Sequence, residues 1–171
     1  MTLKREGKMN QKVSSNGIII TKQTEQCYLY AYLCPAGVWT IGWGHTKGVK
    51  KGDTITMAQA EKYLLEDLAE AENIVNKELL NLSQNQFDAI VDFVFNVGSS
   101  KFLASTLLKT LKTNPKSDEV ATQLRRWVYA DGSHNGKDDD KDGVVDESGE
   151  KQALGGLVAR REAEIELYFR K

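Results

Sequence analysis

One segment of the sequence, residues 56–78, constrains the fold strongly because it predicts a helix of roughly 20 residues. Thr56 and Gln59 have the spacing of a capping box, in which each side chain bonds the backbone N–H of the other at a helix start. Apolar residues then recur at helical spacing on one face: Leu64, Leu65, Leu68, Ala71, and Ile74 or Val75. A helix of this length is able to bridge two lobes.

The residues before this segment predict β-structure. Within residues 28–46, the stretches "YLYAYL" and "VWTIGWG" are rich in β-favouring residues. They flank the turn "PAG", where Gly37 is free to adopt a positive φ. A short helix, from about residue 14 to 22, is expected to precede them.

The residues after the long helix predict only further helices. A second capping box, Ser83 with Gln86, begins an apolar helix that ends at Gly98. More helices are expected in three places: over about 102–111, after Ser117 with Trp127 and Val128 inside, and over about 157–168. We therefore predict an α+β fold, in which the long helix joins a small β-hairpin lobe to a larger all-α lobe. A substrate is expected in the cleft between them.

The domain organisation follows from the charge pattern. Residues 1–13 are expected to form a flexible lead-in and residues 14–171 a single domain, with an acidic loop inserted at about 131–153. Residues 131–150 carry a net charge of −6 in a chain of net charge −1, so the remaining chain carries +5. A mildly basic body suits an anionic polymer, although a solvated surface without a particular partner has the same pattern.

Neither a membrane span nor a signal peptide is visible in the sequence. There is no run of about 18 apolar residues. The first residues, "MTLKREGKMNQK", are charged and lack an apolar signal core. We expect a chain without a stable membrane anchor that begins in the cytoplasm. A chain trimmed of a signal or an anchor would look the same.

Three residues around the β-rich stretch are candidate catalytic residues. Glu25 lies at the junction between a helix and a strand, where partial burial of its carboxyl group would suit a general acid. Thr40 faces away from its apolar strand neighbours and could hold a water molecule. Cys34 ends the first strand. Taken singly, each residue more often has an ordinary structural role: Glu25 as a surface acid, Thr40 as a β-favouring strand residue, and Cys34 as a small buried apolar residue.

Together the three residues have a recognisable spacing. Glu25, eight residues, Cys34, five residues and Thr40 resemble the pattern E-x8-(D or C)-x5-T of the phage-type lysozymes, the muramidases of glycoside hydrolase family 24. Further stretches resemble the same family in order: "AYLCPAGVWTIGWGHT", "GDTITMAQAEKYLLEDLAEAE", "LSQNQFDAIVDFVFNVGSSKFLASTLLKTL" and "GGLVARREAEIELY". The resemblance covers about residues 14–170, with gaps only near 131–153.

The resemblance implies a lysozyme-like fold and an endolysin, a peptidoglycan hydrolase that lyses the host cell. Its reaction would be hydrolysis of the β-1,4 bond between N-acetylmuramic acid and N-acetylglucosamine, with inversion. Glu25 would protonate the leaving oxygen, and Thr40 would position the attacking water. A monomer is expected, with no nucleic-acid partner and no cofactor for catalysis. The enzyme would stay in the host cytoplasm until a separate protein opened the membrane.

Both cysteines depart from the commoner family pattern. Cys34 stands where an acid is usual, and some family members share this substitution. We expect it to help position water or substrate, because an ordinary thiol has a pKa of ~8.5 and is mostly protonated at neutral pH. Cys27 has the position of a cysteine that, in some anchored phage endolysins, pairs with the catalytic cysteine. A Cys27–Cys34 disulfide would be a reversible redox lock; a buried thiol is the alternative.

The resemblance also indicates binding residues. Phe95, Asn96 and Gly98 lie where the family lines its cleft, and Asn96 would bond an acetamido sugar or cap a helix. His45 is expected to be structural. Two arginines of the last helix, Arg160 and Arg161, would meet either peptide-stem carboxylates or Glu162 and Glu164 in ion pairs.

The acidic insert contains a candidate calcium loop. Its D-x-D-x-D-G pattern places oxygen ligands as an EF-hand does, although Gly149 stands where the final Glu is expected. The expected ligands are Asp138, Asp140, Asp142, Val144 and Glu147. Bound Ca²⁺ would stiffen the insert and would take no part in the chemistry. A solvated acidic loop is the alternative.

Two other functions fit parts of the sequence. A wall-binding protein that has lost activity would explain Cys34, but the intact Glu25 and Thr40 argue against it. A hydrolase of another N-acetylated glycan, such as chitin, would use the same acid and the same water.

Overall fold

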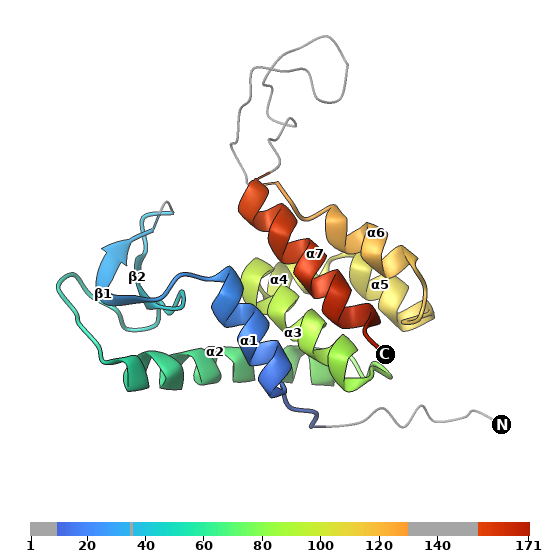
Figure 1. Ribbon diagram of the computed structural model, residues 1–171, viewed down its shortest axis with the longest axis horizontal. Helices are drawn as coiled ribbons and strands as arrows, with labels where there is room; N and C mark the ends of the chain where they lie inside the picture. Colours follow the sequence, from blue (N-terminus) through green and yellow to red (C-terminus); the bar gives the residue numbers. More distant parts are fainter. Residues whose placement is uncertain (1–9, 35, 130–153) are drawn as a thin grey trace, which may run out of the picture.

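The computed structural model describes residues 10–34, 36–129 and 154–171, which form seven helices and two strands. Their order is α1 (Ser15–Thr24), β1 (Tyr28–Leu33), β2 (Trp39–Gly42), α2 (Met57–Lys77), α3 (Gln84–Val97), α4 (Ser99–Leu103), α5 (Thr106–Thr113), α6 (Glu119–Arg125) and α7 (Gly155–Phe169). Figure 1 shows the hairpin at one end, α4 to α7 at the other, and α2 running between them. The predicted α+β fold with a long connecting helix is confirmed.

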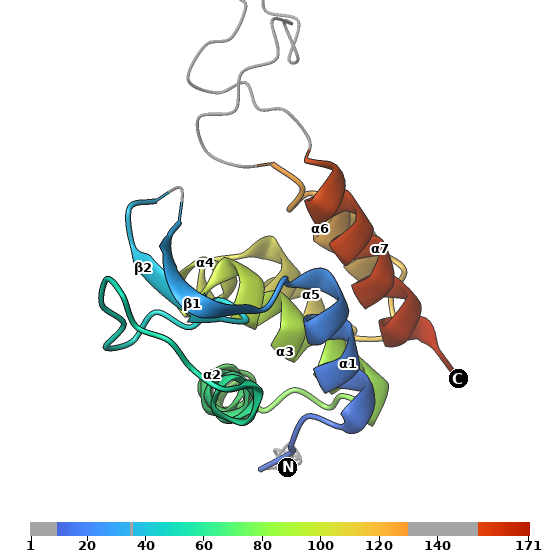
Figure 2. The ribbon, with the colours of Figure 1, turned by 60° about the vertical axis from the view of Figure 1, so that its left-hand side comes forward.

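Helix α3 forms the centre of the helical lobe. It packs against α1, α2 and α7, and every residue from Phe87 to Val94 is buried. Figure 2, in which α2 is seen nearly end-on, shows α1 beside α3 and α7. Two carboxylates, Asp88 and Asp92, lie within this buried stretch and need partners. Asp88 accepts hydrogen bonds from the backbone N–H of Ser14, at 2.9 Å, and from its hydroxyl, which ties α1 to α3.

Both predicted capping boxes are present and fix where α2 and α3 begin. Thr56 Oγ1 accepts from Gln59 N–H at 3.2 Å, and Gln59 Oε1 accepts from Thr56 N–H at 2.8 Å. Ser83 and Gln86 make the same reciprocal pair at 3.3 and 3.0 Å. Gly98, with φ of 89°, ends α3 as predicted, in a conformation that favours glycine.

The helix predicted over 102–111 is wrong, because the chain breaks into α4 and α5. Ser105 causes the break: its hydroxyl accepts from Leu108 N–H at 3.1 Å and donates to Phe102 O at 2.6 Å. A serine that bonds the local backbone in this way competes with continuous helix. The helical spacing of the leucines continues on both sides of the break, from Leu103 to Leu107 and Leu111, and this is why the sequence suggested a single helix.

The helix predicted after Ser117 forms, but Trp127 and Val128 lie beyond its end at Arg125. The carbonyl of Val128 instead accepts from Leu154 N–H, the residue before α7, at 2.9 Å. The Trp127 ring packs edge-on against Phe93, and Val128 is buried, so both are apolar because they belong to the core. Their predicted placement inside a helix was wrong.

The hairpin has an irregular register. Tyr32 pairs with Thr40, and Tyr28 pairs with Gly42. Between these two pairs, β1 advances by four residues while β2 advances by only two, so β1 is bulged. Between these pairs, β1 bonds residues 53–55 instead: Ala31 N–H donates to Asp53 O at 2.8 Å, and Ile55 N–H donates to Leu29 O at 2.9 Å. In the turn, Gly37 has φ of 77°, as its predicted role requires.

The last three residues of the predicted lead-in, Gln11, Lys12 and Val13, bind α2. Gln11 and Asn76 exchange two hydrogen bonds, at 3.0 and 2.9 Å. Glu72 accepts from Lys12 Nζ at 2.9 Å and from Val13 N–H at 2.7 Å. Residues 1–9, and the whole acidic insert at about 131–153, lie outside the described residues. Among the helices that the structure describes, none is long and apolar enough to cross a membrane.

Candidate active site

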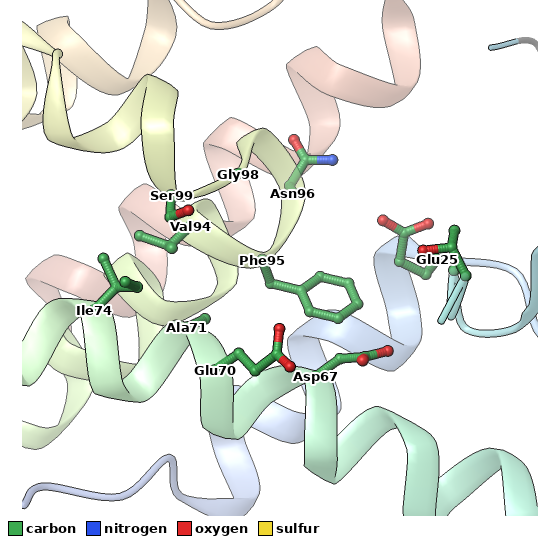
Figure 3. Close-up of a pocket in the computed structure, with 12 residues that line it drawn as sticks. Glu25, Asp67, Glu70, Ala71, Ile74, Val94, Phe95, Asn96, Gly98 and Ser99 are labelled. Atoms are coloured by element: carbon green, nitrogen blue, oxygen red, sulfur yellow. The ribbon is translucent and has the colours of Figure 1, made fainter. Parts of the chain in front are cut away.

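A cavity of about 490 Å³ lies where the two lobes meet. Its walls come from the end of α1, the loop after β2, the middle of α2, and the end of α3 with the residues that follow it (Figure 3). Four of the predicted site residues line it: Glu25, Phe95, Asn96 and Gly98. Figure 3 shows the Phe95 ring pointing into the cavity, between the acidic side chains of α2 and Glu25. Segments far apart in the sequence thus converge as the resemblance implied.

Glu25 is fixed at the end of α1. Its backbone is extended, with φ of −113° and ψ of 140°, so the chain leaves the helix here and turns toward β1. Its N–H still bonds Thr21 O at 3.0 Å, which completes the last helical turn. The side chain is 29% exposed and lines the cavity, so the carboxyl group is partly withdrawn from water.

Arg160 of α7 donates a hydrogen bond from Nη1 to Glu25 Oε1. Its side chain is only 3% exposed, and two parallel bonds of 2.9 Å to Asp92, from Nε and Nη2, hold the guanidinium plane in place. Burial alone lowers the pKa of Arg160, but Asp92, Glu25 and Glu164 together raise it above its ordinary value. Arg160 therefore remains charged and fixes one oxygen of Glu25.

Thr21 completes this network and was not anticipated from the sequence. Its hydroxyl donates to Asp92 Oδ1 at 2.6 Å, so one buried carboxylate serves both α1 and α7. Asp92 was also missed. The signal was weak: Asp88 and Asp92 fall one turn apart in a strongly apolar helix, and only the structure shows that both are buried and so require partners.

Arg161 supports Asn96. Its Nη2 donates to Asn96 Oδ1 at 2.6 Å, which orients the amide at the rim of the cavity. Both arginines are buried, so the hypothesis that they meet peptide-stem carboxylates is wrong. Glu162 pairs with exposed Arg125 instead, with its two oxygens 2.7 and 3.0 Å from the guanidinium.

Glu164 lies beneath both arginines. Its Oε1 is 3.7 Å from Arg160 Nε and 3.0 Å from Arg161 Nη2, yet neither carboxyl oxygen has a hydrogen bond within the described residues. Burial raises the pKa of Glu164 well above its ordinary value. The negative charge of Asp92 raises this pKa further, while Arg161 and Arg160 oppose the shift, so the surroundings hold Glu164 toward its neutral form.

Cys34 and Thr40 face each other on the hairpin. Hydrogen bonds from the backbone N–H of Val38, above all, and from Ala36, Gly37 and the Thr40 hydroxyl lower the pKa of Cys34, while burial opposes this shift. The turn thus surrounds the sulfur with donors, as an anion site does. The Thr40 hydroxyl also lies 3.0 Å from Val38 O, and the residue is 3% exposed.

Both cysteines are free thiols in the structure, which therefore describes the reduced form. Cys27 packs against the apolar core, and burial raises its pKa. The Cys27–Cys34 lock concerns the oxidised form and remains a prediction.

His45 links the loop after β2 to α2. Its Nδ1 lies 3.0 and 2.9 Å from the two oxygens of Asp67, its Nε2 lies 3.0 Å from Lys47 O, and its ring stacks on Tyr63. These contacts agree with the structural role expected from the resemblance. Burial raises the pKa of Asp67, and the His45 ring offsets only part of that shift. Asp67 and Glu70 line the cavity and were not among the predicted site residues.

The predicted calcium ligands, Asp138, Asp140, Asp142, Val144 and Glu147, lie outside the described residues. In the part of the chain that the structure describes, no group of three or more His, Cys, Asp or Glu side chains is placed to hold a metal ion.

Comparison with known proteins agrees with this geometry. The Phage lysozyme family matches residues 22–164. An endolysin of Acyrthosiphon pisum secondary endosymbiont phage 1 is 39% identical over 157 residues, which cover 91% of this chain and 97% of that protein. The muramidase domain of SpmX from Asticaccaulis excentricus superposes with a TM-score of 0.80 at 29% identity, over 95% of this chain and all of that one. The chain therefore belongs to the phage lysozyme family.

Proposed function

We propose that the protein is an endolysin that hydrolyses peptidoglycan between N-acetylmuramic acid and N-acetylglucosamine, with inversion at the anomeric carbon. The observation that carries the proposal is the position of Glu25, partly buried in the wall of the inter-lobe cavity and held by Arg160. Family membership supports the lysozyme chemistry, and the donor-lined Cys34 and Thr40 supply the second half of the site.

Glu25 acts as the general acid in this proposal. Arg160 holds Oε1, so the other oxygen of the carboxyl group carries the proton toward the glycosidic oxygen. Fixing the carboxyl plane in advance favours proton transfer, because the acid need not search for its orientation in the transition state.

Thr40 and Cys34 act on the opposite face of the sugar. The Thr40 hydroxyl orients the attacking water, and a thiolate at Cys34 offers negative charge to the oxocarbenium-like transition state. The donors around the Cys34 sulfur make this anion more accessible than an ordinary thiol would be. Water attacks from the face remote from the leaving group, which inverts the configuration.

Phe95, Asn96 and Gly98 bind the substrate from the helical side. The Phe95 ring offers an apolar surface to a pyranose ring. Arg161 engages Asn96 Oδ1, which leaves the amide N–H groups to donate to an acetamido carbonyl or a sugar hydroxyl. Gly98 lies at the cavity rim, where an added Cβ would meet no atom within 4 Å, so its role is to leave room and to end α3.

We also propose how the protein behaves in the cell. The enzyme acts as a monomer on peptidoglycan, does not bind nucleic acid, and needs no cofactor for catalysis, while Ca²⁺ stiffens the acidic insert. It stays in the host cytoplasm until the membrane is opened. Calorimetric titration with Ca²⁺, with Asp140→Ala as the control, tests the insert; cell fractionation before and after membrane permeabilisation tests the location.

Product analysis tests the proposed reaction. Purified peptidoglycan digested by the enzyme should gain new reducing ends that are N-acetylmuramic acid, and NMR during early turnover should show the α-anomer first. Reducing ends of N-acetylglucosamine, or a first-formed β-anomer, would contradict the proposal. Chitin oligomers should remain uncut, and their cleavage at a comparable rate would favour a broader N-acetylated glycan hydrolase.

A further inference from the structure

Three tyrosines on β1 form a connected cluster. Tyr28, Tyr30 and Tyr32 occupy alternate positions of β1, and contacts between their rings bring them together on one side of the strand. The ring of Tyr28 lies 5.9 Å from that of Tyr30, edge-on, and 4.5 Å from that of Tyr32. A straight strand would separate residues four apart by about 13 Å. The rings of Tyr28 and Tyr32 meet because the irregular register bends β1 between them.

The tyrosine cluster adjoins the catalytic residues. Tyr32 pairs directly with Thr40 across the hairpin, so their side chains share a face. Burial raises the pKa of Tyr32, and its neighbours Tyr28, Glu25 and Cys34 raise it further. The Tyr28 hydroxyl donates to Gln26 Oε1, beside Glu25, at 2.7 Å.

The outer member of the cluster is unusually exposed. Tyr30 is 59% exposed, more than any other large apolar or aromatic side chain in the part of the chain that the structure describes. The six residues of β1, "YLYAYL", include no charged side chain that would solvate the surface. An aromatic cluster with an exposed outer ring, on the same hairpin as Cys34 and Thr40, is typical of a binding surface, since folding alone does not require it.

We propose that the tyrosine cluster is a binding surface for the glycan strand, extending the catalytic cavity to sugars beyond the bond that is cut. The occupant is a strand of N-acetylated sugars, because aromatic rings suit the C–H faces of sugars and Tyr32 pairs across the hairpin with Thr40, to which the proposed reaction assigns the attacking water. This inference rests on the proposed function, since it names more of the same substrate.

The chemistry of the surface fits such a ligand. A pyranose ring has one face of C–H groups, which packs on the flat face of an aromatic ring, and equatorial hydroxyl and acetamido groups at its edge. Tyrosine combines an apolar ring with a hydroxyl that donates and accepts. Tyr28 and Tyr30, set at 70° to each other, offer one ring to stack and a second to border the sugar edge.

The test compares two exposed residues on opposite faces of β1. Tyr30→Ala removes the outer ring, and Leu33→Ala removes a side chain of similar exposure, 55%, from the other face. Each is placed in the Glu25→Gln background, and its Kd for peptide-free glycan strands is measured by calorimetry. Tyr30→Ala should weaken binding roughly 2- to 10-fold, as expected for one lost aromatic contact, and Leu33→Ala should not. Tyr30→Phe should recover most of the affinity.

Turnover gives a second readout in the active enzyme. For Tyr30→Ala, kcat/KM should fall more for long glycan strands than for the shortest strand that is cut, because only long strands reach the tyrosine cluster. Thermal melts confirm that each variant folds. Equal affinity in Tyr30→Ala and the parent, or equal losses in Tyr30→Ala and Leu33→Ala, would overturn the proposal.

Other occupants of the surface give different results. If a second copy of the chain covered the tyrosine cluster, sedimentation would show a dimer that Tyr30→Ala disrupts; this would also overturn the inference. Failure of the wild-type enzyme to cut peptidoglycan would instead contradict the proposed function. Cutting of peptidoglycan with no effect of Tyr30→Ala would leave that function standing and remove only the glycan surface.

Discussion

Arg160 donates a hydrogen bond to Glu25 across 135 positions of sequence, and it does so from a side chain that Asp92 holds by two further bonds. The first helix, the central helix and the last helix therefore meet at one guanidinium group. Thr21, Asp92 and Arg160 are buried, so the rigid part of the molecule determines where the candidate acid points.

Arg160→Lys should lower kcat by on the order of 100-fold, because a single ammonium cannot hold Asp92 with two bonds and Glu25 with a third. KM should change much less, since Arg160 is buried behind Glu25 and is not among the residues that line the cavity. Disruption of the buried pair should lower the free energy of unfolding by about 3 kcal/mol. Wall-clearing kinetics measured well below the melting temperature separate the two effects.

Arg125→Lys is the matched control. Arg125 also forms a two-bonded pair with a carboxylate, Glu162, but the partners are 53% and 49% exposed. Such an exposed pair is screened by water and contributes little to stability, and activity should be unaffected. Equal kinetic losses in the two variants would contradict a specific role for Arg160.

Cys34→Asp should preserve or raise activity and change its dependence on pH. The donors around Cys34 lower its pKa, so the thiolate fraction rises with pH at lower pH than for an ordinary thiol. An aspartate, with an ordinary pKa of ~3.9, is already ionised at about pH 6. Between about pH 6 and 8, the rate of the parent should therefore rise more steeply than that of Cys34→Asp. An inactive Cys34→Asp beside an active parent would argue for a thiol-specific role.

Oxidation should inhibit the parent if Cys27 and Cys34 form the predicted lock. With oxidised glutathione as oxidant, the two thiols lose two electrons and two protons, and their sulfurs form one bond. Activity should fall and return with dithiothreitol, whereas Cys27→Ser should not form the internal disulfide. Equal rates of the parent with and without reductant would refute the lock.

Glu164→Gln should make stability less dependent on pH. Because burial raises the pKa of Glu164 in the folded state, the stability that this carboxyl group contributes is present below its unfolded pKa of ~4.3 and is lost as pH rises through the folded value. The amide does not ionise. The melting temperature of the variant relative to the parent should therefore increase from about pH 4 to pH 9, as calorimetry would measure. A constant difference across this range would mean that Glu164 is ionised when folded.

Local signals in the sequence were sufficient for the starts of α2 and α3 and for the outline of the fold. Thr56 with Gln59, and Ser83 with Gln86, satisfy their own helix ends, so their effect is readable without knowledge of the rest of the chain. The break at Ser105 was not readable, because a leucine spacing continued through it and only the hydrogen bonds of its hydroxyl distinguish a cap from an interior serine.

Some residues of the site were also predictable from the sequence, and others were not. The resemblance identified Glu25, Phe95, Asn96 and Gly98, which share one cavity, but it did not identify the partners of the buried charges. For Arg160 the sequence suggested contact with peptide-stem carboxylates or an ion pair within its own helix. Only tertiary packing brings Arg160 to Glu25. Asp88 and Asp92 lie one turn apart in an apolar helix, but their burial, and therefore their need for partners, is visible only in the structure.

The central claim, that Glu25 is the acid of a peptidoglycan hydrolase, is tested most directly by Glu25→Gln. Release of reducing ends from purified peptidoglycan should fall by at least about 100-fold, the lower range for loss of a general acid, while the variant still sediments with the walls and melts no lower than the parent. Release at a rate close to that of the parent, from a folded and wall-bound variant, would contradict the account.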